Sequence, residues 1–254
     1  MNLKRKIFSL GMATMMFLTG SACGGLFTNQ KAYAVITESE KTQFEKLSKI
    51  TGIESEKIIN CLKFSCKDKD YSCELVIIDG SKEHKDCFMD IFVKEDDENA
   101  DKAKAEYMRY YLNGKLREKD NVEGWFSRSV ENINKSVKEN LLPSSITLMI
   151  KVNDEIVGRI GLGPLVNGNP EIGYAIKKEF SSKGITENAV GAALNFLKLL
   201  LSSKKYNFEK LRATAKEENS ASRRILSGRG FKEGNEKIDD GYGPECEYFY
   251  YFNK

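Results

Sequence analysis

The sequence has few of the features that divide a chain or tie it together. It contains four prolines and one histidine among 254 residues, and no repeat or low-complexity linker interrupts it. Hydrophobic residues make up 41% and charged residues 30%, the balance of an ordinary globular protein. A chain of this length can bury a core large enough to fold without disulfides. We therefore expect one large domain, or a medium domain with an extension.

A strong net charge is also missing. The formal net charge is +3, and residues 1–34 hold four of the basic residues and no acidic one. Without that segment, 36 Lys and Arg remain against 37 Asp and Glu, a net charge of −1. Binding to nucleic acid depends on a basic surface. The composition therefore argues against a nucleic-acid partner.

Residues 1–34 have the pattern of a secretory signal peptide. A basic start at 4–6 precedes an uncharged apolar segment at 7–19, and an A-x-A sequence ends at Ala34. The apolar segment is shorter than the roughly 20 residues that a membrane-spanning helix needs. The pattern predicts cleavage after Ala34 and export to the periplasm or beyond. One alternative is a lipoprotein leader lipidated at Cys23, the membrane attachment that the sequence suggests; another is a leader without function and a cytoplasmic protein.

Cysteine usage does not indicate a metal site. The six cysteines are Cys23, Cys61, Cys66, Cys73, Cys87 and Cys246, and the only histidine, His84, lies within the cluster of four. The spacings in that cluster lack the C-x2-C pair of zinc knuckles. Disulfides would suit an exported protein, whereas buried thiols behave as small apolar residues. We expect buried thiols and no metal, with disulfides as the alternative.

Apolar spacing predicts the order of the elements. Residues 35–63 have helical spacing with a break at Thr51-Gly52, and a cysteine-bearing segment with a strand at its centre continues to residue 86. We therefore expect a small N-terminal extension over 35–86. From Cys87 onward, predicted strands are 87–95, 144–152, 155–162, 171–180, 210–217 and two near the C-terminus, the last at 245–253; predicted helices are 99–116, 121–141, 187–201 and 219–231.

The order of these elements excludes a doubly wound sheet. A turn at Asn153-Asp154 joins two of the strands in an antiparallel hairpin. The strand–loop–helix–strand unit over 171–217 predicts a right-handed parallel crossover. The fold is therefore expected to be a mixed α/β (α+β) domain over 87–254.

Two stretches carry a family resemblance. "PEIGYAI" with "SSKGITENAV", and later "ENSASRRILSGRGFKEGN", resemble the strand–loop–helix and the second signature of the GNAT superfamily of N-acetyltransferases. They are most similar to the branch that contains the ribosomal-protein N-terminal acetyltransferases. The resemblance covers residues 87–254 and implies a splayed central sheet flanked by helices. It also implies acetyl-coenzyme A as co-substrate.

The loop before the predicted helix at 187 is the expected pyrophosphate site. A helix N-terminus presents unpaired N–H groups and the positive end of the helix dipole, which together bind phosphate. The residues that the resemblance places there are Ser181, Ser182, Lys183, Gly184, Ile185 and Thr186. The family pattern is Q/R-x-x-G-x-G/A: Gly184 matches it, whereas Ser181 and Thr186 depart from it. A plain turn between a strand and a helix is the alternative.

The same resemblance assigns the rest of the cofactor site. The backbone of Gly173, Tyr174, Ala175 and Ile176 would pair with the pantetheine arm as an added strand and polarise the thioester carbonyl. Asn219 is a good helix N-cap, and in the family this Asn also bonds to pantetheine. An ordinary core strand and an ordinary cap are the alternatives.

Catalysis needs an acceptor amine that loses a proton and a thiolate that gains one. Glu171, at the start of the splayed strand, is the candidate base, with a salt-bridged surface residue as the alternative. Leu226 stands where many relatives have a tyrosine as general acid, so Ser222 is the candidate group that stabilises the thiolate. Trp125 and Phe126 are expected to pack in the core. The alternative is that they line the acceptor pocket.

The sequence thus predicts an N-acetyltransferase that acts on a protein N-terminus, a lysine, a polyamine or a small amine. The alternative is an exported, non-catalytic GNAT-like binding protein or envelope lipoprotein. Acetyl-coenzyme A is a cytoplasmic metabolite, whereas the leader predicts export. Secretion by a bacterium into a host cell, loss of the chemistry, or a leader without function would each resolve this conflict.

Overall fold

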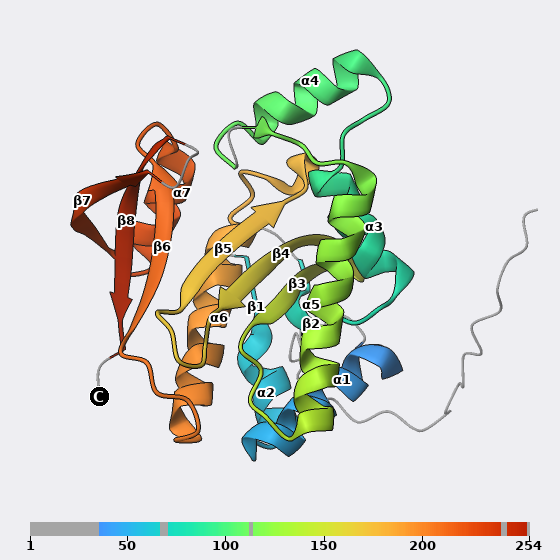
Figure 1. Cartoon of the computed structure of the whole chain (residues 1–254), viewed down its shortest axis with the longest axis vertical. Helices are drawn as coiled ribbons and strands as arrows, with labels where there is room; N and C mark the ends of the chain where they lie inside the picture. Colours follow the sequence, from blue (N-terminus) through green and yellow to red (C-terminus); the bar gives the residue numbers. More distant parts are fainter. Residues whose placement is uncertain (1–35, 67–70, 112–113, 240–242, 253–254) are drawn as a thin grey trace, which may run out of the picture. The chain divides into compact units, whose positions relative to one another are not determined.

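The computed structural model describes residues 36–66, 71–111, 114–239 and 243–252 (Figure 1). The predictions for the leader, including cleavage after Ala34 and lipidation of Cys23, lie outside these residues. Within them, no helix combines the length and the apolar character needed to cross a membrane.

One mixed sheet organises the described residues. Its strands follow the spatial order β1-β2-β3-β4-β5-β6-β8-β7, and the β5–β6 pair is the parallel one among antiparallel neighbours. The bounds are β1 Lys63–Phe64, β2 Cys73–Ile77, β3 Ile146–Val152, β4 Glu155–Gly163, β5 Glu171–Ile176, β6 Lys210–Lys216, β7 Lys232–Asp239 and β8 Pro244–Tyr251. The predicted mixed fold class is confirmed.

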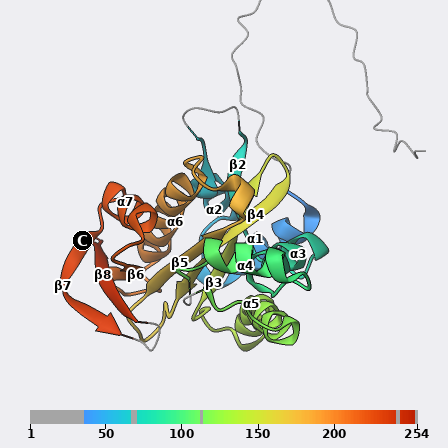
Figure 2. The same ribbon diagram turned by 90° about the horizontal axis from the view of Figure 1, so that it is seen from above.

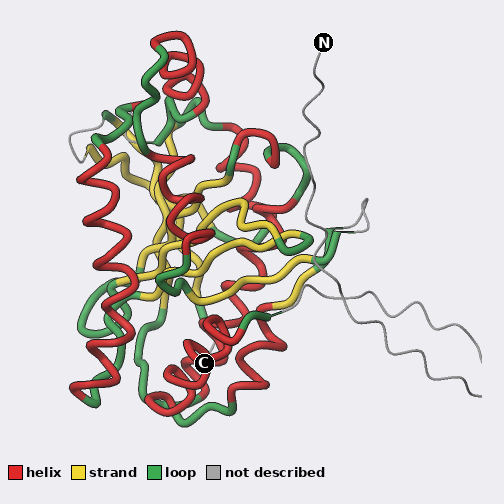
Figure 3. Tube along the Cα trace, turned by 90° about the vertical axis from the view of Figure 1, so that its right-hand side faces the viewer, coloured by secondary structure: helices red, strands yellow, loops and turns green. Residues whose placement is uncertain are grey.

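Helices cover both faces of this sheet. Their bounds are α1 Glu38–Thr51, α2 Ser55–Leu62, α3 Lys82–Phe92, α4 Glu98–Tyr107, α5 Lys119–Glu139, α6 Ile185–Ser202 and α7 Ser220–Gly228, with a short 3-10 turn, η2, at Lys178–Phe180. Helices α2 and α6 lie on one face and α5 on the other (Figure 2). Seen from the side, the strands run between the helices (Figure 3).

Local signals explain the predicted connections. Asn153 and Asp154 adopt φ values of 47° and 69°, the left-handed pair of a tight hairpin turn, and join β3 to β4. The β5–α6–β6 unit is the parallel crossover that the sequence predicts. Gly52, with φ 76°, ends α1 at the predicted break.

Several predicted boundaries are wrong. The helix expected over 99–116 ends at Tyr107. The expected strand at 87–95 is instead the second half of α3, because Phe88, Ile91 and Phe92 recur at helical spacing and bury one face of it. The expected strand at 171–180 ends at Ile176 and is followed by η2. Helix α6 begins at Ile185, two residues before the predicted start at 187, so Thr186 belongs to its first turn.

The residues before Cys87 contribute to the same core as those after it. Strand β2 pairs with β3 inside the sheet, and Phe44 and Leu47 on α1 are fully buried with Ile58 and Leu62 on α2. The boundary expected at Cys87 falls inside α3.

A buried ionic network joins α1, β2, α3 and β3. The Lys151 Nζ lies 3.0 Å from Glu40 Oε2 and 3.8 Å from Glu74 Oε1. The His84 Nδ1 lies 2.8 Å from Asp79 Oδ1, and its Nε2 lies 3.7 Å from Glu40 Oε1. All five side chains are buried. Because a buried charge is stable only when it is paired, this network ties the N-terminal helices to the sheet.

Candidate active site

The strands β5 and β6 meet at one end and then diverge. They share a single registered pair, Glu171 with Arg212, and the Arg212 N–H donates to the Pro170 carbonyl at 2.7 Å. Figure 1 shows the two strands separating from this point toward the end of β5. The splay expected from the family resemblance is therefore present.

Backbone geometry decides which groups of β5 face the splay. The Lys177 N–H donates to the Val157 carbonyl of β4, and main-chain groups alternate in direction along a strand. The main-chain groups of Tyr174 and Ile176 therefore turn away from β4, toward the splay, whereas those of Gly173 and Ala175 turn toward β4. Of the four predicted residues, Tyr174 and Ile176 thus aim their main chain toward the splay, whereas Gly173 and Ala175 use theirs in the pairing with β4.

Side chains from other elements reach the same place. The Tyr107 hydroxyl on α4 donates to the Ile176 carbonyl at 2.9 Å. The Tyr174 hydroxyl lies 3.5 Å from the Ser222 carbonyl on α7, so this side chain spans from β5 to α7. Burial raises the pKa of Tyr174 to about 12. Its hydroxyl therefore stays protonated at neutral pH.

The predicted phosphate loop ends at a glycine that the backbone requires. Gly184 adopts φ 73°, in the left-handed region, and is the N-cap of α6. The Asn188 N–H donates to the Gly184 carbonyl, the first bond of the helix. The N–H groups of Ile185 and Thr186 precede that bond and have no acceptor within the helix. The Ser181 hydroxyl turns back to donate to the Lys178 carbonyl.

Two cations flank this loop, and one of them was not predicted. The Lys183 Nζ lies 4.9 Å from the centre of the Phe180 ring. The Arg229 Nη2 lies 2.7 Å from Asn188 Oδ1 and 3.6 Å from Glu187 Oε1, beside the first turns of α6. Arg229 comes from the segment after α7, and no spacing in the sequence relates it to the loop. The N-terminus of α6 and these cations can together hold an anion.

Glu171 is ion-paired where the strands meet. One carboxylate oxygen bonds to Nη1 of Arg212, and the Arg212 Nε lies 2.6 Å from Oε1 of Glu247 on β8. The Glu171 side chain is 41% exposed, so one carboxylate is held in place and still reaches solvent. The predicted base is therefore oriented by Arg212, a residue that sequence reasoning missed.

The start of α7 lies across the splay from β5. The Asn219 Oδ1 accepts from the Ser222 N–H at 3.1 Å, so Asn219 caps the helix as expected. The cap uses the oxygen and leaves the amide NH2 group for a ligand. Leu226 is fully buried in the core, at the place of the family's usual acid.

The predicted aromatic pair on α5 packs in the core region. Phe126 is buried, and its ring centre lies 5.4 Å from that of Phe88. Trp125 is partly exposed, and its ring centre lies 4.8 Å from that of Phe92.

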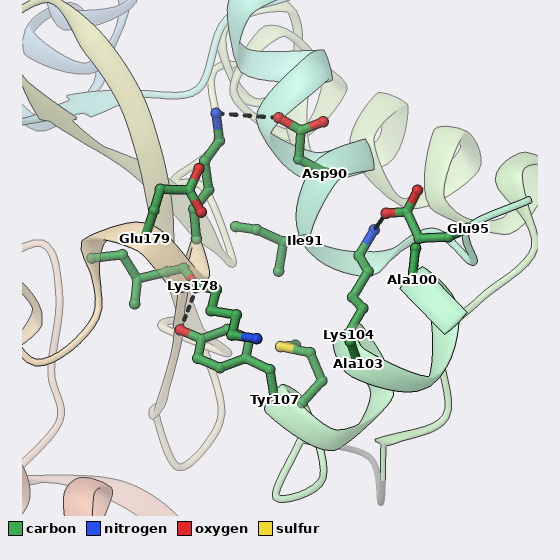
Figure 4. A pocket seen from close by; sticks show the side chains of 12 residues that line it. Asp90, Ile91, Glu95, Ala100, Ala103, Lys104, Tyr107, Lys178 and Glu179 are labelled. Atoms are coloured by element: carbon green, nitrogen blue, oxygen red, sulfur yellow. Dashed lines mark hydrogen bonds and ion pairs between the residues drawn. The ribbon is translucent and has the colours of Figure 1, made fainter. Parts of the chain in front are cut away.

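A cavity of about 400 Å³ adjoins the C-terminal end of β5 (Figure 4). Ion pairs hold its walls: the Lys177 Nζ lies 3.2 Å from Asp90 Oδ2, and the Lys104 Nζ lies 2.6 Å from Glu95 Oε1. Tyr107 lies in its lining. Lys178 and Glu179 of η2 also line it, so the cavity opens beside the segment that leads into the phosphate loop.

The cysteines do not form a reactive centre. Burial raises the pKa of Cys61 and of Cys87 to about 12, which keeps both thiols protonated. The sulfurs of Cys66 and Cys73 lie 3.8 Å apart. Across the ranges that the structure describes, no group of three or more His, Cys, Asp or Glu side chains is arranged to hold a metal ion.

Comparison with known proteins identifies this arrangement. No curated protein matches the sequence. Three solved structures share the fold: RimJ from Mycobacterium smegmatis in complex with CoA-disulfide (16% identity, 70% of this chain and 82% of that chain, TM-score 0.50), the ribosomal L7/L12 alpha-N-protein acetyltransferase RimL (13%, 75% and 94%, 0.51), and the microcin C7 self-immunity acetyltransferase MccE in complex with acetyl-CoA and AMP (14%, 74% and 94%, 0.51). The model of the acetyltransferase (GNAT) domain matches residues 92–232. More than half of the chain, including the splayed strands and the loop before α6, lies in that match, and the protein belongs to the GNAT acetyltransferase family.

Proposed function

We propose that this protein transfers the acetyl group of acetyl-coenzyme A to an amine. The observation that carries the proposal is the loop at the N-terminus of α6 beside the splay of β5 and β6. Acetyl-coenzyme A supplies an activated thioester and a thiol leaving group. Two structural neighbours, RimJ in complex with CoA-disulfide and MccE in complex with acetyl-CoA, support this co-substrate.

The residues present fit such a ligand. The loop from Ser181 to Gly184 and the first N–H groups of α6 would hold the pyrophosphate, with Lys183 and Arg229 supplying positive charge. The main-chain groups of Tyr174 and Ile176 would pair with the amides of the pantetheine arm. The amide NH2 group of Asn219 lies at the start of α7, across the splay.

Proton movements follow from the side chains around the splay. Glu171, oriented by Arg212, takes a proton as the amine nitrogen forms its bond to the acetyl carbon. The carbon–sulfur bond breaks, and the thiolate gains a proton. Ser222 remains the group predicted to stabilise the thiolate. The Tyr174 hydroxyl is a candidate proton donor, because it lies near the Ser222 carbonyl and stays protonated. Much of the rate would come from placing the amine against the thioester.

A protein N-terminus is the first acceptor to test. The neighbour RimL is an alpha-N-protein acetyltransferase, and the Glu171 carboxylate is open to solvent. Lysines, polyamines and small amines fit the same chemistry. We also propose that the leader directs export, with the cytoplasm as the alternative location.

A second function is favoured by one observation. The family's usual acid position is the buried Leu226, as would be found in a GNAT-like protein that has lost catalysis and acts as an exported binding protein. Such a protein could still bind the coenzyme, so binding and turnover must be measured separately.

Isothermal titration of the chain without residues 1–34 tests the proposal, with acetyl-coenzyme A and coenzyme A as ligands. We expect micromolar binding of both, followed by acetylation of at least one amine in a panel of peptides, lysine and polyamines. Binding without turnover would favour the non-catalytic function. If the folded protein binds neither ligand at millimolar concentration, both the proposed co-substrate and the proposed acetyl transfer are wrong.

A further inference from the structure

Arg159 is a buried cation inside an aromatic box. It lies on β4, is 8% exposed, and takes no part in the proposed acetyl transfer. Its Cζ lies 4.5 Å from the ring centre of Trp125, 5.3 Å from that of Phe88 and 5.9 Å from that of Phe92. Aromatic faces attract a guanidinium, so α3 and α5 form a site around this charge.

The guanidinium is incompletely satisfied. In the ranges that the structure describes, no carboxylate is among the groups that act on it; its neighbours are the Tyr111 hydroxyl and the Cys87 thiol. The Nε atom is buried and has no hydrogen-bond partner. Burial lowers the pKa of Arg159. Cation–π contacts offset only part of the cost of burying a charge. A buried arginine without a counter-ion fits a site whose anion arrives with a ligand.

The sheet places this charge on the same face as Glu171. The β4–β5 register pairs Arg159 with Ala175, Gly161 with Gly173 and Gly163 with Glu171, and the two members of a pair share a face. The three pairs therefore form a row that runs from the guanidinium to the predicted base.

Glycines leave room in the middle of that row, which the guanidinium fills at Gly161 and which stays open at Gly173. A Cβ at Gly161 would lie 2.2 Å from the Arg159 Nη2, so the guanidinium leans along the strand over Gly161. A Cβ at Gly173 would have nothing within 4 Å. From the Gly161–Gly173 pair to Glu171 is two residues along β5, roughly 7 Å. A short chain with an amine at one end and an anion at the other fits this separation.

We propose that Arg159 binds the carboxylate of the acceptor, and that the acceptor is a short amino acid or peptide whose amine lies near Glu171. This inference rests on the proposed acetyl transfer for the role of the amine. It narrows the acceptor to amines that carry a carboxylate. Arg159 is a binding residue in this account, because the guanidinium can offer two parallel N–H donors to one carboxylate.

The only tryptophan of the chain, Trp125, makes the site observable. A ligand that reaches Arg159 comes into contact with that ring or its surroundings, so tryptophan fluorescence reports binding without any turnover. Two probes form a matched pair: 5-aminovalerate, and pentylamine, which has the same five carbons and no carboxylate. The full chain is titrated with each probe, with and without coenzyme A.

We expect 5-aminovalerate to change the fluorescence saturably at a concentration roughly 10- to 100-fold lower than pentylamine, the range of a charge-assisted hydrogen-bonded pair. Arg159→Met should remove this preference, and Arg159→Lys should retain part of it. Arg128→Met removes an exposed arginine that lies one turn after Trp125 on α5. This variant should keep the wild-type preference for 5-aminovalerate. Equal titrations with both probes, or a preference that survives in Arg159→Met, would overturn the inference.

Kinetics and folding complete the test. In wild type, kcat/KM for acetylation should favour 5-aminovalerate over pentylamine by the same factor, and Arg159→Met should raise KM for 5-aminovalerate alone. Thermal unfolding shows whether each variant is folded, and coenzyme A binding shows whether the cofactor site is intact. Carboxylate selectivity in fluorescence without coenzyme binding would contradict the proposed function and leave Arg159 as an anion site. Coenzyme binding without selectivity for the carboxylate would contradict only the proposed role of Arg159 and leave the proposed function standing.

Discussion

Glu171 and Glu247 share one arginine, but only Glu171 lies at the start of the splayed strand. Both carboxylates bond to Arg212. If Glu171 is the base, Glu171→Gln should lower kcat by about 10²-fold, the lower range for general base catalysis. Coenzyme A binding should not change, because the proposed coenzyme site lies farther along β5 and at α6. The measurement is steady-state kinetics with titration of coenzyme A.

Glu247→Gln is the matched control for that variant. It removes the other partner of Arg212 and leaves the proposed base in place, so kcat should fall much less. Equal losses in the two variants would mean that Glu171 acts through the ion pair alone.

Two hydroxyl groups compete for the role of proton donor to the thiolate. Tyr174 spans to the Ser222 carbonyl and remains protonated, as its pKa of about 12 requires. We expect Tyr174→Phe to lower kcat at least about tenfold while the Kd of coenzyme A stays within a factor of about three of wild type. Ser222→Ala is the comparison. If Ser222→Ala alone lowers kcat, the group that acts on the thiolate is the serine that the sequence predicts to stabilise it.

At the scale of elements, a negative charge placed at the N-terminus of α6 tests whether this helix binds pyrophosphate. The charge should have opposite effects on the stability of the helix and on coenzyme binding. A carboxylate at a helix N-terminus stabilises the helix by about 0.3–1 kcal/mol, but it repels a pyrophosphate. Both Gly184→Ala and Gly184→Asp place a side chain at φ 73°, which costs about 1–2 kcal/mol. We expect Gly184→Asp to be at least as stable as Gly184→Ala and to lose coenzyme A binding, measured by thermal unfolding and calorimetry. If both variants bind coenzyme A equally well, the loop does not hold the pyrophosphate and is a plain turn.

Elements with strong local signals could be predicted, and those that depend on distant packing could not. The Asn153-Asp154 hairpin and the Asn219 cap carry their geometry in a few adjacent residues. The second half of helix α3 is predicted as a strand because its apolar residues cluster. The helical spacing of Phe88, Ile91 and Phe92 becomes decisive only when the fold shows that they bury one face together.

The same limit applies to the site. Gly184 and Glu171 could be found because a loop and a strand end mark them in the sequence. Arg212, Arg229 and Arg159 lie on β6, after α7 and on β4, and each meets its partners only through the fold. A cation carries no periodic signal of its own, so these three were missed.

For the whole molecule, the buried network makes stability depend on pH. Burial raises the pKa of Glu74 to about 7, and repulsion from Glu40 adds to this while Lys151 opposes it; Lys63 and Asp154 act more weakly in opposite directions. The folded pKa lies above the unfolded value of about 4.3. Protonated Glu74 therefore stabilises the fold fully below about pH 4.3, and this contribution is lost as the pH rises through about 7.

The other members of the network also change how stability depends on pH. Burial alone would lower the pKa of His84, but its contacts with Asp79 and Glu40 outweigh burial and raise it, so its contribution is also lost as the pH rises. Burial would raise the pKa of Asp79 and of Glu40, but hydrogen bonds to His84 lower both, so their contributions are lost as the pH falls. Stability should therefore be greatest at mildly acidic pH.

Glu74→Gln tests this directly. It removes the group that must ionise, so the loss of stability between pH 5.5 and pH 8, about 2 kcal/mol from Glu74, should become smaller. Urea unfolding at both pH values measures it. Glu56→Gln, an exposed change on α2, should retain the wild-type slope. A Glu74→Gln protein with the wild-type slope would show that Glu74 ionises normally in the fold.

The role of the residues before Cys87 can be decided by truncation. A chain that begins at Cys87 loses β2, α1 and α2, and with them the fully buried Phe44 and Leu47. It also leaves Lys151 without Glu40. Deleting even one buried large side chain costs about 2–5 kcal/mol, against a total stability of about 5–15 kcal/mol. We expect this chain to be unfolded by circular dichroism and unable to bind coenzyme A. A chain that begins at residue 36 should fold and bind coenzyme A. If the shorter chain folds and binds the coenzyme, the N-terminal elements are an accessory extension, as the sequence alone suggests. If it does not, the acetyltransferase domain of this protein requires them as part of its core.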